Sequence, residues 1–224
     1  MKPILCPSLM CADLGRLAEE VRALDAAGAD IFHCDIMDGV FVPNITLGLP
    51  DVRAVRRVTR KKVDCHLMIR DPAEKVQWFT DAGADIVYVH PEAGGDTAEA
   101  LRRIRAAGAA PGIAVNPETG IGDVLPLLPL CEYVTVMTVH PGFAGQKFIP
   151  ETREKAILFA AMKETFGYTL LIDGACSPAV IRDLFAEGVN GFVLGTSALF
   201  GKGEYRQVLA ELHSNSEFGI RNSE

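Results

Sequence analysis

Apolar runs and amphipathic stretches alternate along the chain, and one junction between them recurs. An amphipathic stretch ends at a glycine, and a short apolar, β-prone run follows directly. The junction reads LDAAGADIFHCDI, FTDAGADIVYVHP, IRAAGAAPGIAVN and LFAEGVNGFVLGT. Glycine at this point supplies the left-handed turn that ends a helix. Because the apolar runs do not alternate with polar residues, they are typical of strands buried on both faces, as in a parallel sheet.

The pattern as a whole predicts eight strands separated by helices. The strands are expected at 3–7, 31–35, 62–67, 85–90, 111–115, 133–138, 169–172 and 191–194. Eight alternating units of strand and helix predict an α/β protein that forms a single-domain (β/α)8 TIM barrel. An open, doubly wound sheet is the alternative.

Two of the predicted helices carry start signals. Asp71 stands before Pro72, with Glu74 three positions after the aspartate, and this arrangement predicts an N-cap at Asp71. Ser177 stands before Pro178 and predicts a second N-cap.

The barrel is expected to form one domain over residues 1–212, because no linker or break in composition divides the 224 residues. The tail over 213–224 has no apolar periodicity, so we expect it to be disordered and in part a remnant of cloning. No apolar run reaches about 18 residues, and no membrane span is expected.

Charge and cysteine usage narrow the class of protein. The net charge is −7, from 22 basic and 29 acidic residues, and no basic patch indicates a nucleic-acid partner. An anionic substrate must therefore be bound by a local site. The six cysteines are scattered singly, without a C-x-x-C pair, and the N-terminal segment lacks the apolar stretch of a secretory signal. We expect reduced thiols in a cytoplasmic protein.

Polar side chains gather where the predicted strands end, which is the side of a barrel that carries the active site. The strand ends read Ser8, His33 and Asp35, His66, His90, Asn116, Met137, Asp173, then Gly195 and Thr196.

Four of these residues predict a metal site: His33, Asp35, His66 and Asp173. Two imidazoles and two carboxylates suit one divalent ion per chain, such as Zn²⁺, Mn²⁺, Co²⁺, Fe²⁺ or Mg²⁺. A cation between His33 and Asp35 would offset the cost of burying both on one face of a strand. The alternative is a buried, hydrogen-bonded pair of His33 and Asp35 without a metal.

Three further polar residues near the strand ends are expected to support the metal ligands or the local backbone. His90 is expected to stand behind the metal ligands or to be structural. Asp64, two positions before His66, either orients that imidazole or bonds to the backbone. Asp38 precedes Gly39 and is expected to form a turn.

Three methionines, Met37, Met68 and Met137, follow or end strands. Taken alone, they are best interpreted as residues that fill gaps in the core. A soft apolar lid over the reacting atoms is the alternative.

Three loops predict a phosphate site: VHPGFAGQKF with Gly142 and Gly145, DGACSP before a helix, and LGTSALF with a short helix at Thr196. Backbone N–H groups at helix N-termini bind anions, and a phosphate site after strands 7 and 8 recurs in this fold. Such a site needs no Arg or Lys.

The motifs PSLMCADL, HCDIMDGVFVPNITLG, DCHLMI, NPET, VMTVHPGFAGQKFIPE, LIDGACSP and VLGTSALF stand in order from Pro7 to about Phe200. Together they resemble the ribulose-phosphate 3-epimerase family. The resemblance implies a metal-dependent epimerase that acts on a ketose phosphate, with Asp35 and Asp173 as the acid–base pair. It also implies that the methionines surround an enediolate, and that the chain forms a homo-oligomer, either a dimer or a hexamer. The implied substrate-binding residues are Ser8, Met37, His66, Met68, Met137, Gly142, Phe143, Ala144, Gly145, Gly174, Ala175, Gly195 and Thr196.

Details around Met10, Ala144, Ala175 and Thr196 resemble the allulose-6-phosphate 3-epimerase branch, which interconverts D-allulose 6-phosphate and D-fructose 6-phosphate. His140 departs from both patterns, where Asn or Asp is usual. The alternative substrate is D-ribulose 5-phosphate, which would give D-xylulose 5-phosphate. A phosphosugar lyase on a related barrel would need a D-x-K-x-x-D lysine, which HCDIMDG lacks. A phosphosugar-binding protein without activity is a further alternative.

Overall fold

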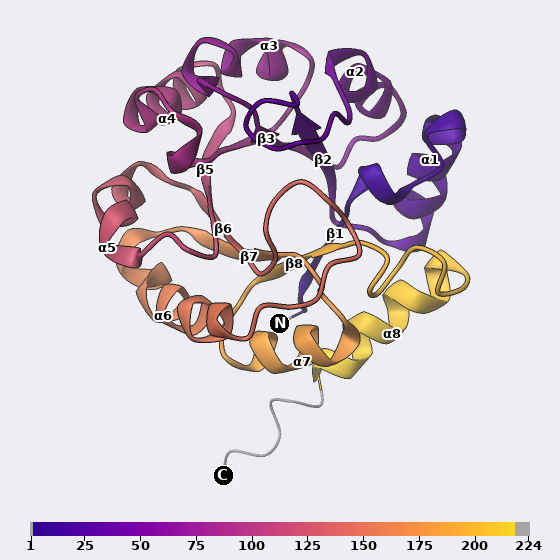
Figure 1. Ribbon diagram of the computed structural model, residues 1–224. Helices are drawn as coiled ribbons and strands as arrows, with labels where there is room; N and C mark the ends of the chain where they lie inside the picture. Colours follow the sequence, from indigo (N-terminus) through magenta and orange to yellow (C-terminus); the bar gives the residue numbers. More distant parts are fainter. Residues whose placement is uncertain (1, 218–224) are drawn as a thin grey trace.

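Eight parallel strands form a barrel inside a ring of helices in the computed structural model, which describes residues 2–217, with side chains up to residue 214 (Figure 1). The strands are β1 (Ile4–Pro7), β2 (Ile31–Met37), β3 (Lys62–Met68), β4 (Ile86–Val89), β5 (Ala110–Val115), β6 (Tyr133–Met137), β7 (Thr169–Asp173) and β8 (Gly191–Leu194). The helices are α1 (Leu17–Ala27), α2 (Leu49–Val58), α3 (Val76–Asp81), α4 (Thr97–Ala106), α5 (Ile121–Val124), α6 (Glu151–Phe166), α7 (Pro178–Ala186) and α8 (Tyr205–Glu217). Short 3₁₀ turns lie at Leu9–Cys11, Leu14–Arg16, Pro72–Glu74, Pro91–Ala93 and Leu125–Leu130.

The order of the strands closes the sheet. Each strand pairs with its sequence neighbour from β2 to β8, and β8 pairs in turn with β1. A parallel bridge between Ser8, just after β1, and His33 of β2 joins the first two strands. The predicted (β/α)8 barrel is confirmed, and the open sheet is excluded.

Alternation along each strand divides its side chains between two cores. In β2, Phe32, Cys34 and Ile36 face outward and pack in the large core between strands and helices. Ile31 faces inward and belongs to a smaller core inside the barrel. His33, two residues further on, shares the inner face with Ile31 because successive side chains of a strand point to opposite sides.

Both predicted N-cap positions are present, but only one of the two side chains makes a capping hydrogen bond. The Ser177 hydroxyl accepts a hydrogen bond from Val180 N at 3.3 Å and starts α7. Asp71 occupies the predicted N-cap position, with Pro72 directly after it, but it starts the 3₁₀ turn Pro72–Glu74 and its side chain makes no capping bond. Asp71 has a left-handed backbone (φ 47°), its N–H donates to Ala93 O, and its carboxylate lies beside Gly94 instead of over the start of the turn.

The C-terminal boundary differs from the prediction. Helix α8 continues to Glu217, so residues 213–217 are helical where we expected no regular structure. The rest of the predicted tail, 218–224, lies outside the described residues. None of the helices within 2–217 combines the length and apolar character needed to cross a membrane.

Candidate active site

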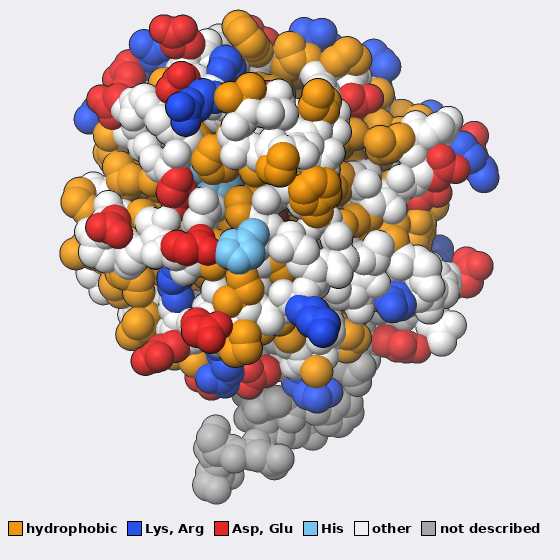
Figure 2. Space-filling model, in the orientation of Figure 1, with side chains coloured by type: hydrophobic (Ala, Val, Ile, Leu, Met, Phe, Trp, Pro, Cys, Tyr) orange, Lys and Arg blue, Asp and Glu red, His pale blue; other side chains and the backbone are white. Residues whose placement is uncertain are grey.

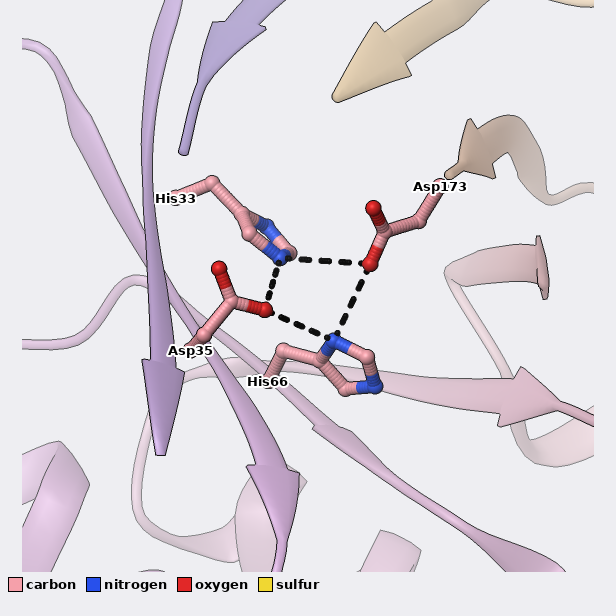
Figure 3. A group of neighbouring side chains, drawn as sticks. All are labelled: His33, Asp35, His66 and Asp173. Carbon is pink, nitrogen blue, oxygen red and sulfur yellow. Dashed lines mark ion pairs between the residues drawn. The ribbon is translucent and has the colours of Figure 1, made fainter. Parts of the chain in front are cut away.

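Four side chains meet at the end of the barrel where the strands finish (Figure 3). His33 and Asp35 come from β2, His66 from β3 and Asp173 from β7. One nitrogen or oxygen atom of each lies within 4.8 Å of the other three. The register of the β2–β3 pair places Asp35 directly beside His66, which explains why these two side chains meet.

The spacing of the four atoms suits a single ion. Asp35 Oδ1 lies 3.3 Å from His33 Nε2 and 3.4 Å from His66 Nδ1. Asp173 Oδ2 lies 3.3 Å from His66 Nδ1 and 3.8 Å from His33 Nε2. Ligands about 2.0–2.1 Å from a tetrahedral ion are separated by roughly 3.3 Å from one another. These four separations are close to that value, and all four ligand atoms lie within 4.8 Å of one another, so the predicted ligand set could hold a metal ion.

The same distances argue against a simple hydrogen-bonded pair. An N–H···O bond normally spans 2.7–3.2 Å, which is shorter than any of these four separations. His33 Nε2 and His66 Nδ1 are buried and have no hydrogen-bond partner among the described residues. Two buried ring nitrogens that face two carboxylates fit the donor set of a divalent cation. The cluster can hold such an ion.

Charge within the cluster keeps Asp35 ready to bind a cation. Burial alone would raise the pKa of this carboxyl group, but the His33 and His66 imidazoles, in their protonated form, lower it well below its usual range. Asp35 is thus ionised at neutral pH. Its second oxygen, Oδ2, accepts a hydrogen bond of 2.6 Å from Ser8 Oγ, which fixes the orientation of the carboxylate.

Asp64 supports His33 rather than His66. Asp64 Oδ1 lies 2.7 Å from His33 Nδ1, on the side of the ring opposite the cluster. The prediction that Asp64 orients His66 was wrong because neighbouring strands lie only about 4.8 Å apart, whereas residues i and i+2 of one strand are about 6.6 Å apart. Asp64 is the direct cross-strand neighbour of His33. A carboxylate behind a metal-binding imidazole fixes its tautomer and orientation.

His90 stands directly behind His66. The two Nε2 atoms are 2.7 Å apart, and both side chains are fully buried. Burial lowers the pKa of His90 to about 4, so this imidazole is neutral at physiological pH.

A pocket opens above the four-residue cluster. Its lining includes the ends of β2, β6 and β7 and the loops that follow β6, β7 and β8. Of the predicted substrate-binding residues, all but His66 contribute to this lining: Ser8, Met37, Met68, Met137, Gly142, Phe143, Ala144, Gly145, Gly174, Ala175, Gly195 and Thr196. His66 is buried behind the wall. Asp35 and Asp173 face the pocket, so a ligand in it can reach both carboxylates.

The three methionines combine the two roles that the sequence left open, core packing and contact with a ligand. Met37 and Met68 form a small apolar cluster with Val42, and Met137 belongs to the core inside the barrel. All three also line the pocket. They fill space and at the same time present soft, apolar surface to a ligand.

The loops after β6, β7 and β8 make one end of the pocket. Gly174 has a φ of 115°, and a Cβ there would lie 2.6 Å from Val139 Cγ2, so the chain passes too closely for a side chain. The short helix expected at Thr196 is instead a hydrogen-bonded turn, in which Leu199 N donates to Gly195 O at 3.0 Å. Among the described residues, no Lys or Arg lines the pocket. A phosphate would have to rely on backbone N–H groups here.

Figure 2 views the same face of the barrel: hydrophobic and uncharged atoms dominate around its centre, and most Lys and Arg side chains lie towards the edge. At the mouth of the pocket, His140 Nδ1 lies 3.0 Å from Glu118 Oε1, and both side chains are exposed. Asn44 Nδ2 donates to Gly142 O at 2.7 Å and ties the loop after β2 to the loop after β6.

Several lining residues were not predicted as part of the site, among them Cys11, Gln146 and Ser197. Each lies inside a motif that was recognised and directly follows a residue that was singled out, so adjacency in sequence was the available signal. Residue type gave none, because these side chains are common on any surface loop.

Comparison with known proteins places the chain in a family. The model of the "Ribulose-phosphate 3 epimerase family" matches residues 4–200. Similar curated proteins include ribulose-phosphate 3-epimerases of Synechocystis sp., 40% identical over 98% of this chain and 94% of the relative, and of Mycobacterium tuberculosis, 42% identical over 94% and 91%.

Similar solved structures include a 3-keto-L-gulonate-6-phosphate decarboxylase from Vibrio cholerae, with a TM-score of 0.73 and 18% identity over 97% of this chain and 99% of the other. A 3-hexulose-6-phosphate synthase from Salmonella typhimurium has a TM-score of 0.70 and 20% identity over 98% and 100%. At such low identity, these structures show the fold alone.

The curated relatives are named for ribulose phosphate, so the allulose-6-phosphate branch that the motifs indicated is not shown. Family model and relatives both cover nearly the whole barrel, including every strand that contributes to the cluster. The chain belongs to the ribulose-phosphate 3-epimerase family, whose members are isomerases.

Proposed function

We propose that the chain is a metal-dependent 3-epimerase that inverts C3 of a ketose phosphate, with D-ribulose 5-phosphate and D-xylulose 5-phosphate as its main substrate pair. One observation carries the reaction type: Asp35 and Asp173, from β2 and β7, face the same pocket next to two imidazoles. Inversion of a carbon next to a carbonyl needs an acid and a base on opposite faces of that carbon. The names of the relatives support the five-carbon substrate.

His33, Asp35, His66 and Asp173 would hold the divalent ion. When bound, the ion would supply a Lewis acid that draws electron density from the C2 carbonyl of the sugar. Asp64 and His90 keep the two imidazoles in place from behind.

The two aspartates move the proton. One carboxylate removes the proton from C3, and the C–H electron pair forms a double bond to C2 while the carbonyl electrons move onto oxygen. The other aspartate, in its protonated form, then delivers a proton to the opposite face of C3 and restores the carbonyl. The reverse reaction exchanges their roles, so each turnover leaves the pair ready for the opposite direction. Ser8 holds Asp35 in its orientation through the 2.6 Å hydrogen bond.

The remaining lining would position the sugar and exclude water. Met37, Met68 and Met137 would pack against the reacting carbons, where apolar contacts strengthen the electrostatic interactions of the intermediate. The loops at 142–145, 173–175 and 195–196 would bind the phosphate. Binding energy at this remote group positions C3 between the two carboxylates.

Solvent exchange tests the reaction type. In D₂O, the wild-type protein should incorporate deuterium at C3 of ribulose 5-phosphate while xylulose 5-phosphate forms. Removal of metal with a chelator should stop both, and one equivalent of a divalent ion per chain should restore both. A protein that binds the sugar phosphate but never exchanges the C3 proton, with metal verified, would be a binding protein instead of an epimerase.

D-Allulose 6-phosphate is the second candidate substrate, favoured by one specific observation. The residues that resemble the allulose branch, Met10, Ala144, Ala175 and Thr196, all line the pocket. They therefore stand where a longer sugar would differ from a shorter one. A lyase is disfavoured, because the part of the chain that the structure describes places no lysine in the pocket lining.

A further inference from the structure

The imidazoles of His33 and His66 face the two carboxylates of the cluster through different ring nitrogens. His33 directs Nε2 at the two carboxylates and Nδ1 at Asp64. His66 does the reverse: Nδ1 faces Asp35 and Asp173, and Nε2 faces His90. The two rings thus need different tautomers to offer a lone pair to the same ion, and each tautomer is set by what lies behind the ring.

The contact behind His66 is a hydrogen bond between two imidazoles. The ring centres lie 4.9 Å apart, whereas the two Nε2 atoms are only 2.7 Å apart. The nitrogens therefore lie between the ring centres, and the rings meet edge to edge. One nitrogen must donate and the other must accept. If His66 Nδ1 offers its lone pair to an ion, its proton is on Nε2, and His90 Nε2 has to accept it.

Glu92 favours that arrangement. A neutral His90 that accepts at Nε2 carries its own proton on Nδ1. Nδ1 lies 3.4 Å from Glu92 Oε2, which is longer than a normal hydrogen bond, so the carboxylate favours a proton at Nδ1 through electrostatic attraction. The other oxygen, Glu92 Oε1, accepts from Asn116 N at 3.2 Å and from the Thr119 hydroxyl. Glu92 is thus anchored by the loop that carries the NPET motif.

That loop is itself held from outside the barrel. Lys155 of α6 donates to three carbonyl oxygens of the loop: Asn116 O at 2.9 Å, Pro117 O at 2.6 Å and Thr119 O at 2.7 Å. A continuous set of contacts therefore runs from α6 through the loop and Glu92 to His90 and His66.

We propose that His90, oriented by Glu92, is a positioning residue that holds His66 in the tautomer whose Nδ1 lone pair faces the metal site. This inference rests on the metal site of the proposed function. Without the acceptor at His90, His66 can place its proton on either nitrogen, and only one of the two tautomers can bind an ion.

Metal affinity and the geometry of the bound ion test the proposal without reference to turnover. We would measure the Zn²⁺ dissociation constant by competition with a chromophoric chelator, and the visible spectrum of the Co²⁺ form. His90→Ala should weaken Zn²⁺ binding by about 10–100-fold and change the Co²⁺ spectrum, in line with the usual effect of losing such a partner. His90→Gln keeps an acceptor near the position of Nε2 and should recover most of the affinity.

Tyr88→Phe is the matched control. The Tyr88 ring is fully buried and its centre lies 6.4 Å from that of His66, but no hydrogen bond between the two is present among the described side chains. This variant should bind Zn²⁺ with nearly wild-type affinity.

The outcomes distinguish failure of the proposed metal site from failure of the proposed role of His90. A wild-type protein that binds no Zn²⁺ would refute the metal site and this inference with it. A wild-type protein that binds Zn²⁺, with His90→Ala equal to it in affinity and Co²⁺ spectrum, would overturn only the role of His90. If His90→Ala does not fold, Glu92→Ala decides, because it should weaken binding in the same direction. Equality of Glu92→Ala with Tyr88→Phe would then overturn the proposal.

Discussion

Asp35 makes different contacts through its two carboxylate oxygens. Oδ1 faces His33 and His66 in the cluster, while Oδ2 accepts the hydrogen bond of Ser8. Asp173 has its own oxygen in the cluster, but its side chain is 14% exposed against 5% for Asp35. At the scale of single residues, the two carboxylates of the proposed proton transfer therefore have different surroundings, and they should respond differently to substitution.

We expect Asp35→Asn and Asp173→Asn each to lower complete epimerisation by at least about 10²–10⁴-fold, because an amide cannot accept or deliver the proton. Each variant should retain exchange of the C3 proton in one epimer better than in the other, since the remaining carboxylate still reaches its own face. Isotope exchange measured separately from each epimer, with metal content checked, tests this. Near-normal turnover in either variant would contradict the two-base scheme.

His66→Ala should lose the bound ion while the barrel still folds. The substitution removes a ligand and leaves a cavity, for which we expect a stability cost of a few kcal/mol. Metal analysis after gel filtration, together with circular dichroism, distinguishes loss of the ion from loss of the fold. Retention of one ion per chain would remove His66 from the ligand set.

At the scale of elements, the site depends on loops that pass close to one another. Gly174 follows β7 and lies against Val139 of the loop after β6, and Gly142 of that loop is tied to Asn44 of the loop after β2. A small residue and a side-chain-to-backbone bond thus hold the loop after β6, which lines the pocket, between the loops after β7 and β2.

Gly174→Ala should destabilise the fold and disturb the proposed phosphate end of the pocket. The backbone has a φ of 115°, and the new Cβ would lie 2.6 Å from Val139 Cγ2 and 2.9 Å from Val139 N. We expect a loss of about 1–3 kcal/mol in the free energy of unfolding and a higher KM. Urea unfolding and steady-state kinetics measure the two effects.

Gly122→Ala in α5 is the control for that substitution, because within residues 2–217 no atom outside its own helix and chain neighbours lies within 4 Å of its Cβ position. It should leave KM unchanged and be neutral or stabilising by about 0.4–1 kcal/mol. Equal effects of the two substitutions would show that the close passage at Gly174 is unimportant.

At the scale of the whole molecule, the cluster links strands that are far apart in sequence. Its ligands span β2, β3 and β7, so an ion bound there would join both halves of the chain. The homo-oligomer and the cytoplasmic location stay predictions.

Binding of the ion should stabilise the barrel, since only the folded chain brings the four ligands together. At a free ion concentration of about 100 times the dissociation constant, linkage predicts a gain of roughly 2.7 kcal/mol. Thermal unfolding with Zn²⁺ and with a chelator measures the shift. The His66→Ala variant should show none, and an equal shift in that variant would indicate binding elsewhere.

The choice of substrate depends on the whole barrel, because the barrel sets the distance between the cluster and the loops proposed to bind phosphate. Ribulose 5-phosphate and allulose 6-phosphate share C2, C3 and a terminal phosphate, and differ by one hydroxymethylene between them. We expect a higher kcat/KM for ribulose 5-phosphate, by no more than about 10–200-fold, which is what one carbon typically provides. Parallel assays of kcat/KM for the two sugar phosphates at equal metal loading test this expectation. A higher value for allulose 6-phosphate would assign the chain to that branch.

The barrel fold and the four candidate ligands could be predicted from the sequence alone. Unbroken apolar runs after helix-ending glycines predicted the parallel barrel, because burial on both faces requires them. The polar strand ends predicted which residues would meet, since parallel strands of a barrel finish on one side. His33, Asp35, His66 and Asp173 were recognised on that basis, and the structure brings their ligand atoms within 4.8 Å of one another.

Only the tertiary structure decided which side chains pair behind the cluster. Asp64 was assigned to His66 by its spacing along the strand, but it contacts His33, because its cross-strand neighbour is closer than the residue two positions away. The contact of His66 with His90 depends on two strands meeting at one depth, and the turn at Asp71 depends on a bond to Ala93. Local pattern determines which face of a strand a residue occupies, whereas its partner across the barrel depends on register and closure, which no local pattern contains.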